Sequence, residues 1–167
     1  MARRKQCAGD KAEVGVADVL VPPENDGPGA ALQSPVSDIV ARLVGDDDAQ
    51  RQRGAAVHLQ DPWSGVLDLV LAGVIRKLEE PGGARHRGAC AALVAFGAAA
   101  VWPLAVALAT SPDAAFRARA AATLFALGQT GSGGDRLRVV QALRDRCRWD
   151  EAPEVRAVAQ KALNALE

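Results

Sequence analysis

The chain has 167 residues, of which 20 are Lys or Arg and 20 are Asp or Glu, so its formal net charge is zero. This length suits one domain or a short array of repeats, and a hydrophobic content of 49% excludes wholesale disorder. The apolar residues are mostly Ala, Leu and Val and there is no Tyr, which favours an all-α fold over a β-sandwich or barrel.

The N-terminal residues 1–33 are predicted to form a disordered or loosely packed tail, followed by a folded domain over 34–167. The tail contains Pro22-Pro23 and the turn cluster Asp26-Gly27-Pro28-Gly29, with charges of both signs. Its basic start is not followed by an apolar run, so we expect no secretory signal.

From about Pro35 onward, apolar residues recur at helical spacing and predict eight helices. Clusters of Gly, Pro and Asp separate them, and the short connections make neighbouring helices antiparallel. The Gly-rich stretch from Gly128 to Gly134 is expected to be a flexible linker. The predicted helices span 35–44, 48–60, 64–79, 84–96, 99–110, 113–127, 135–148 and 152–166.

The segment from Gly88 to Pro112 carries no charge and is long enough to span a bilayer. Gly97 and Pro103 interrupt it, however, and the weakly hydrophobic Ala dominates its composition. We therefore predict two packed helices divided at Gly97 and no membrane segment.

The helices recur as hairpins. The sequence Arg-Gln-Arg-Gly-Ala at 51–55 returns as Arg-His-Arg-Gly-Ala at 85–89, and a weaker third copy stands at 117–121. In each unit an acid also precedes an arginine by six residues, so stacked hairpins could join an acid of one unit to the arginine of a neighbour. This predicted ladder consists of Asp47 and Arg53, Glu79 and Arg85, Asp113 and Arg119, and Asp150 and Arg156.

Two stretches carry a family resemblance. One unit shows Gly97, Val101-Trp102-Pro103-Leu104, Asp113 and Leu124, and another shows Pro153-Glu154-Val155-Arg156 with Ala159. These residues resemble the HEAT-repeat family, in particular the short bacterial repeats grouped as HEAT-like or phycobilisome-lyase-like.

The resemblance implies an α-α superhelix, or solenoid, of roughly three to four helical hairpins, in which second helices line the concave face. It also implies that the acid and arginine pairs act as a structural ladder between repeats. The expected repeats cover approximately 35–60, 64–96, 98–128 and 134–167.

No catalytic constellation is recognisable in the sequence. His58 and His86 have no partner at ligand spacing, and no Ser or Cys stands in a nucleophile motif. We therefore expect no enzyme activity, no metal and no cofactor. Two alternatives stay open through the resemblance: a bilin lyase-like enzyme or accessory factor, and a nucleic-acid-binding protein like the HEAT-like DNA glycosylases.

Three widely separated cysteines, Cys7, Cys90 and Cys147, do not form a disulfide framework or a metal motif. An odd number of unpaired thiols is typical of a reducing compartment. We therefore predict a cytoplasmic protein.

The candidate partner-binding surface is basic. Residues 1–83 have a net charge of −4 and residues 84–167 a net charge of +4, so the C-terminal half can face an acidic protein surface or peptide. Nucleic acid is a less favoured partner because the total charge is neutral. Trp102 is expected in the core or in the packing between repeats, whereas Trp63 and Trp149 are either exposed anchors or caps packed on their neighbours. The predicted contact residues are Arg51, Arg87, Arg117, Lys161 and Trp149.

Overall fold

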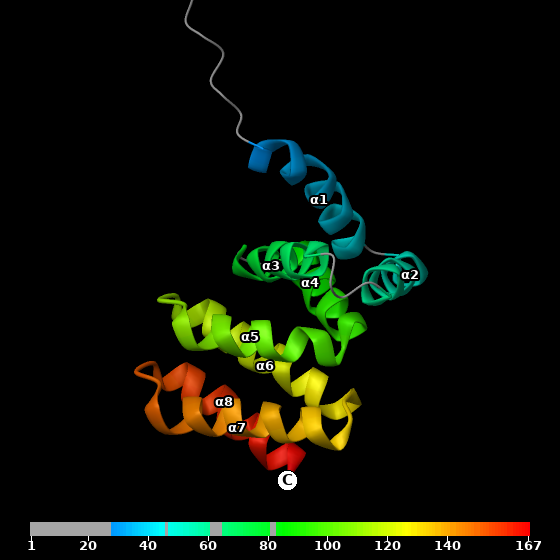
Figure 1. The fold of residues 1–167 in the computed structure, drawn as a ribbon. Helices are drawn as coiled ribbons and strands as arrows, with labels where there is room; N and C mark the ends of the chain where they lie inside the picture. The colour runs from blue at the N-terminus through cyan, green and yellow to red at the C-terminus, as the bar shows by residue number, and fades with distance from the viewer. Residues whose placement is uncertain (1–27, 46, 61–64, 81–82) are drawn as a thin grey trace, which may run out of the picture.

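The computed structural model describes residues 28–45, 47–60, 65–80 and 83–167, and this part of the chain forms eight helices and no strand (Figure 1). Cys7, Trp63 and the expected tail up to residue 27 lie outside the described residues. The helices are α1 (Pro28–Val44), α2 (Asp48–Leu59), α3 (Val66–Glu79), α4 (Gly83–Phe96), α5 (Ala98–Thr110), α6 (Ala114–Thr130), α7 (Gly133–Trp149) and α8 (Pro153–Leu166).

Helices α3 to α8 form three stacked hairpins. Within each hairpin α3 packs on α4, α5 on α6 and α7 on α8, and between hairpins α3 contacts α5, α5 contacts α7, α4 contacts α6 and α6 contacts α8. The first helices α5 and α7 form one layer and the second helices α6 and α8 lie behind them (Figure 1). Contacts restricted to neighbouring helix pairs define an α-solenoid.

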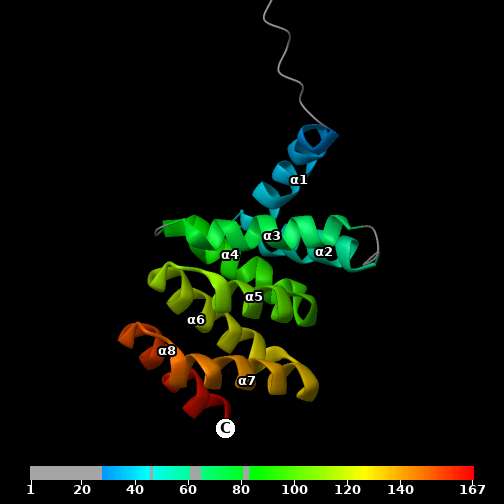
Figure 2. The ribbon, with the colours of Figure 1, turned by 60° about the vertical axis from the view of Figure 1, so that its left-hand side comes forward.

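Helices α1 and α2 pack differently from the later hairpins. Helix α1 contacts both α3 and α4, and α2 contacts α4. Both ribbon views show α1 inclined to the helices of the stack (Figures 1 and 2). The approach of α1 to α4 is close at Gly88, where an added Cβ would lie 1.8 Å from the Val44 carbonyl oxygen.

One apolar core runs through the described helices. Its largest fully buried side chains include Phe96, Phe116 and Leu124, and small residues such as Ala120 and Ala159 have no exposed surface. The alanines let second helices approach closely, while the leucines and phenylalanines fill the space between layers. Apolar burial at about 25 cal/mol per Å² is the main stabilising term for such a stack.

The uncharged stretch forms two helices, as predicted. Helix α4 ends at Phe96, α5 begins at Ala98, and Gly97 turns the chain with a φ of 57°, a conformation that favours glycine. Within the described residues, no helix combines the length and the apolarity that crossing a bilayer requires.

Several element boundaries differ from the prediction. Helix α1 begins at Pro28 and contains Pro35 in its interior. Helix α6 continues to Thr130 and α7 starts at Gly133, so the predicted flexible linker over 128–134 is wrong. Gly128 is buried inside α6, where an added Cβ would lie 3.1 Å from both Leu166 and Val139, so the glycine serves helix packing.

Candidate functional site

Three second helices, α2, α6 and α8, carry an arginine as their fourth residue, and its guanidinium donates to backbone carbonyls at or just beyond the end of the preceding helix. These carbonyls have no partner within their own helix, so the arginine satisfies them and closes the hairpin. We call these three residues the closing arginines. The donor and acceptor sets are Arg51 with Leu43 and Gly45 (3.2 and 2.6 Å), Arg117 with Ser111 and Pro112 (both 3.0 Å), and Arg156 with Asp150 and Glu151 (2.7 and 2.9 Å).

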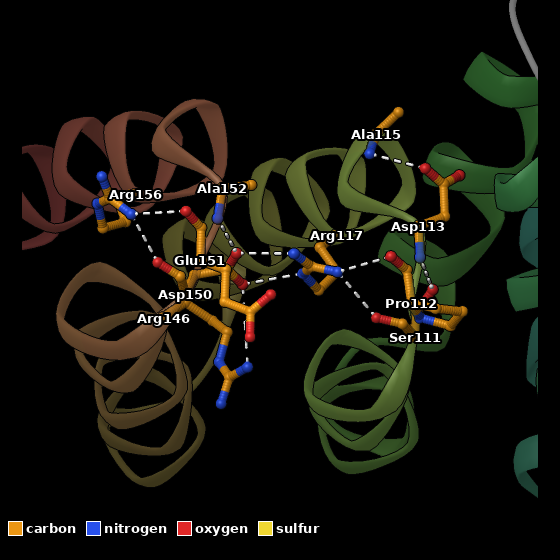
Figure 3. Close-up of polar contacts among 10 residues, drawn as sticks. All are labelled: Ser111, Pro112, Asp113, Ala115, Arg117, Arg146, Asp150, Glu151, Ala152 and Arg156. Atoms are coloured by element: carbon orange, nitrogen blue, oxygen red, sulfur yellow. Dashed lines mark hydrogen bonds and ion pairs between the residues drawn. The ribbon is translucent and has the colours of Figure 1, made fainter.

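With α1 and α2 counted as the first hairpin, Arg117 also joins the third hairpin (α5 and α6) to the fourth (α7 and α8). Its Nε and Nη2 atoms donate to the two carboxylate oxygens of Asp150, each at 2.9 Å, in a bidentate pair (Figure 3). The Asp150 side chain is 1% exposed and also accepts from the Ala152 amide at 3.0 Å. Arg146 of α7 approaches the same carboxylate at 3.9 Å. Asp150 is therefore the acceptor at which two hairpins meet.

The pair shifts the titration of both partners. Burial raises the pKa of Asp150, but the hydrogen bonds from Arg117 and the Ala152 amide outweigh it and hold that pKa below its ordinary value. The hydrogen bond to Asp150 raises the pKa of Arg117. Both side chains are therefore charged in the neutral pH range.

Arg119 joins the third hairpin to the second. Its Nε and Nη2 atoms donate to the carbonyls of Leu78 (2.9 Å) and Glu79 (3.1 Å) at the end of α3. Its guanidinium also lies 3.6 Å from the Asp113 carboxylate. Helix α6 thus supplies both arginines that connect neighbouring hairpins, one toward α3 and one toward α7.

Three of the four predicted ladder pairs do not form as ion pairs, and the fourth, Asp113 with Arg119 at 3.6 Å, lies within one hairpin and does not link two. Arg53 donates to the Ala49 carbonyl of its own helix (3.0 Å), and Arg85 lies 3.6 Å from Glu80 rather than pairing with Glu79. Arg156 binds the main-chain oxygen of Asp150, whose carboxylate is occupied by Arg117. Asp47 and Asp113 also cap the N-termini of α2 and α6 with their side-chain oxygens.

In the second hairpin His86 occupies the place of a closing arginine, because it is the fourth residue of α4. Arg119 binds the carbonyls that such an arginine would satisfy. The His86 Nε2 atom lies 3.6 Å from the Cys90 Sγ atom, which in turn lies 3.2 Å from the Thr123 hydroxyl of α6. Burial, followed by the charges of Arg119 and Arg87, lowers the pKa of His86. Burial raises the pKa of Cys90.

A groove follows the second helices α4, α6 and α8, and we call it the second-helix groove. It consists of two cavities of about 330 and 340 Å³ that share Ala122. Neither cavity is lined by Asp or Glu, whereas His86, Arg119 and Lys161 provide basic groups. The other lining residues are Cys90, Ala118, Thr123, Phe125, Ala126, Val158, Ala162 and Ala165.

The five predicted contact residues do not form one surface. Arg51 is buried, and the Arg117 guanidinium is held by hydrogen bonds to Asp150 and to two carbonyls. The prediction that both side chains project to an exposed face is therefore wrong. Arg87 is exposed on α4 and Lys161 is exposed in the groove on α8. Trp149 is 75% exposed at the end of α7, beside a separate cavity that Arg117 and Arg146 also line.

His86 and Arg119 line the groove but are not among the residues predicted to contact a partner. The sequence did contain a signal for Arg119. Arg51 and Arg117 each follow a capping aspartate by four residues and so occupy equivalent positions. Arg119 lies two residues beyond that position and is therefore available for a different contact. Trp102 was also misplaced: its side chain is 72% exposed on α5. The described residues contain no group of three or more His, Cys, Asp or Glu that could hold a metal ion.

A family model of HEAT repeats matches residues 73–164, from within α3 to within α8. Comparisons with curated proteins and with solved structures find no match to the chain. HEAT repeats commonly mediate protein–protein interaction or scaffolding and are generally non-catalytic. Because the match spans more than half of the 167 residues and coincides with the stacked hairpins, the chain belongs to the HEAT-repeat family.

Proposed function

We propose that the protein is a non-catalytic interaction module that binds an extended acidic segment of another protein along the second-helix groove. The observation that carries this proposal is the make-up of the groove: an apolar floor with His86, Arg119 and Lys161 beside it and no acid among its lining residues. In a HEAT solenoid this is the face that curves inward around a partner.

The shape of the groove suits a chain segment with small side chains. Ala118, Ala122 and Ala126 of α6 and Ala162 and Ala165 of α8 line it with small side chains. Small side chains on the groove let the backbone of a bound segment approach the helices closely. Recognition therefore depends on the path of the bound backbone and on charge.

The basic groups differ in how firmly they are held. Arg119 is fixed by two backbone carbonyls, so its guanidinium is already ordered before a partner arrives. Lys161 and Arg87 are exposed and free to follow a bound carboxylate. Exposed charges of one sign raise the association rate with an acidic partner, and salt weakens this effect.

The proposal is tested with a labelled peptide of alternating Glu and Ala, measured by fluorescence anisotropy against the full chain. Lys161→Glu should weaken binding about tenfold, because an attraction becomes a repulsion at the groove. Arg148→Glu is the matched control, since Arg148 is exposed on α7 and lines neither cavity. Equal losses in the two variants, or equal binding of a Lys–Ala peptide, would contradict the proposal.

We also propose a cytoplasmic location. Cys90 and Cys147 are free thiols, and free thiols persist in reducing compartments. Alkylation of both cysteines in intact cells by a membrane-permeant reagent, with no alkylation by an impermeant one, is the expected result.

A further inference from the structure

The layer of first helices has a groove of its own. Helices α5 and α7 lie side by side (Figures 1 and 2), and a cavity of about 340 Å³ runs between them, which we call the first-helix groove. On its α5 side Trp102 is 72% exposed and Val106 is 41% exposed. Large apolar side chains that are exposed next to each other, as Trp102 and Val106 are, indicate an interaction site.

Helix α7 contributes a row of polar side chains to the same groove. Arg138, Gln141 and Asp145 are spaced by three and four residues and therefore share one face of the helix. Arg138 is 71% exposed and lies 3.6 Å from Asp135, while Gln141 donates to Asp145 at 3.1 Å. The row thus carries Arg138 at one end and Asp145 at the other, two helical turns apart, and Arg146 lines the groove beside Asp145.

We propose that the first-helix groove binds a second copy of this chain, with the two α7 helices packed antiparallel about a two-fold axis. An axis that passes between Gln141 and Ala142 places Arg138 opposite the partner's Asp145, and Asp145 opposite the partner's Arg138. A surface that carries both charges in this order is complementary to itself, as an isologous interface requires. A net charge of zero adds no overall repulsion between the copies.

The same rotation gives the exposed tryptophan a partner. Ala109 and Arg146 line the cavity beside Trp149, so the C-terminal ends of α5 and α7 lie together, and Trp102 stands toward the other end. In an antiparallel pair Trp102 therefore faces the C-terminal end of the partner's α7, which carries Arg146 and Trp149. A guanidinium against an indole is a favourable contact.

The dimer goes beyond the proposed function and uses a different face of the molecule. The second-helix groove stays open in both copies, so the dimer presents two acidic-segment sites. Two linked sites bind a bivalent partner more tightly than either site alone.

Sedimentation equilibrium of the full chain over a wide concentration range tests the dimer. The wild type should show a monomer–dimer equilibrium, and Arg138→Asp or Asp145→Arg alone should each raise the dissociation constant about tenfold or more, because each reverses two symmetry-related contacts. The double variant Arg138→Asp/Asp145→Arg should return to within about threefold of the wild type, since it restores attraction at both contacts.

Two further variants separate the interface from folding. Arg42→Asp changes an exposed charge on α1, which packs on α3 and α4 and not on α5 or α7, and should leave the dissociation constant unchanged, whereas Trp102→Ala should raise it about tenfold. Circular dichroism melts check that every variant folds. A wild type that stays monomeric, or a double variant no stronger than the single ones, would overturn the dimer. Peptide binding by Arg138→Asp remains a separate measurement, so failure of the dimer is distinguishable from failure of the second-helix site.

Discussion

The first and third hairpins begin alike and end differently. Each has an aspartate, Asp47 or Asp113, that caps its second helix and a closing arginine four residues later. Arg51 pairs with the exposed Asp48 of its own helix and so serves one hairpin. Arg117 reaches the buried Asp150 of the following unit and so serves two. The same local sequence therefore closes both hairpins, but it links a hairpin to the next one only where the next unit supplies an acid.

The hairpins are attached to their neighbours in two ways, either by arginine side chains or by a close approach of the backbones. The third hairpin is fixed on both sides by α6, through Arg119 toward α3 and Arg117 toward Asp150. The first hairpin rests on the second through a close backbone approach at Gly88. The family match, which begins at residue 73, covers the region with arginine-linked stacking and omits α1 and α2.

The largest effect is expected from Arg117→Met. This change leaves the Asp150 carboxylate buried without its main partner, which costs about 3 kcal/mol of unfolding free energy for a buried ion pair. Urea denaturation, followed by circular dichroism, measures the loss. The double variant Arg117→Met/Asp150→Leu should recover part of it, because no buried charge then remains. A loss no larger than that of an exposed pair would show that stacking does not depend on this contact.

Gly88→Ala tests the other mode of attachment. The new methyl group would overlap the Val44 carbonyl, so α1 must move away from α4 at a cost of about 2 kcal/mol. Gly54→Ala is the matched control in the first hairpin, since its methyl group meets only the flexible end of Leu43. Hydrogen exchange should show the loss of protection concentrated in α1 and α2. Uniform loss through α8 would contradict separate attachment.

Arg51→Met should be the milder counterpart of Arg117→Met. The substitution removes the hydrogen bonds from Arg51 to two carbonyls, but Asp48, which loses its partner, is exposed and stays hydrated. We therefore expect a loss of about 1 kcal/mol in the free energy of unfolding. The comparison of the two arginine variants under identical urea conditions is the measurement. Equal losses would mean that closing the hairpin, rather than stacking, accounts for both.

Local signals predicted most of the helices. The capping Asp113 and the proline at the start of α8 fixed helix beginnings to within one residue, and Gly97 divided the uncharged stretch correctly. The linker prediction failed at Gly128 because a single sequence does not distinguish a glycine in a linker from a helical glycine that packs against Leu166. Helix packing decides between the two roles.

The arginine contacts could not be predicted by matching charges. The closing arginines and Arg119 bind mainly main-chain carbonyls, which every residue possesses and which amino-acid composition does not reveal.

The prediction for Trp102 was wrong because it used the hydrophobicity of the side chain and not its position around the helix. Leu104 and Leu108 face the core, and Trp102 lies about 200° around the helix from Leu104, on the outer side.

The smallest effect concerns the second hairpin, where His86 stands in place of a closing arginine. Burial and the neighbouring Arg119 and Arg87 lower its pKa below the ordinary value of about 6.5, so the folded chain binds fewer protons there than the unfolded chain. Its contribution to stability is therefore complete above that value and declines as the pH falls through the lowered pKa.

His86→Gln should reduce the difference in unfolding free energy between pH 7.5 and pH 5.5, with both chains measured by urea denaturation. An NMR titration of the His86 imidazole should give a midpoint below that of a free histidine. A midpoint above that of a free histidine would contradict this prediction, because the fold would then favour the charged ring and its stability would rise as the pH falls. Protonation below the midpoint adds a positive charge to the second-helix groove, so the same residue that weakens the fold in acid should strengthen binding of the Glu–Ala peptide.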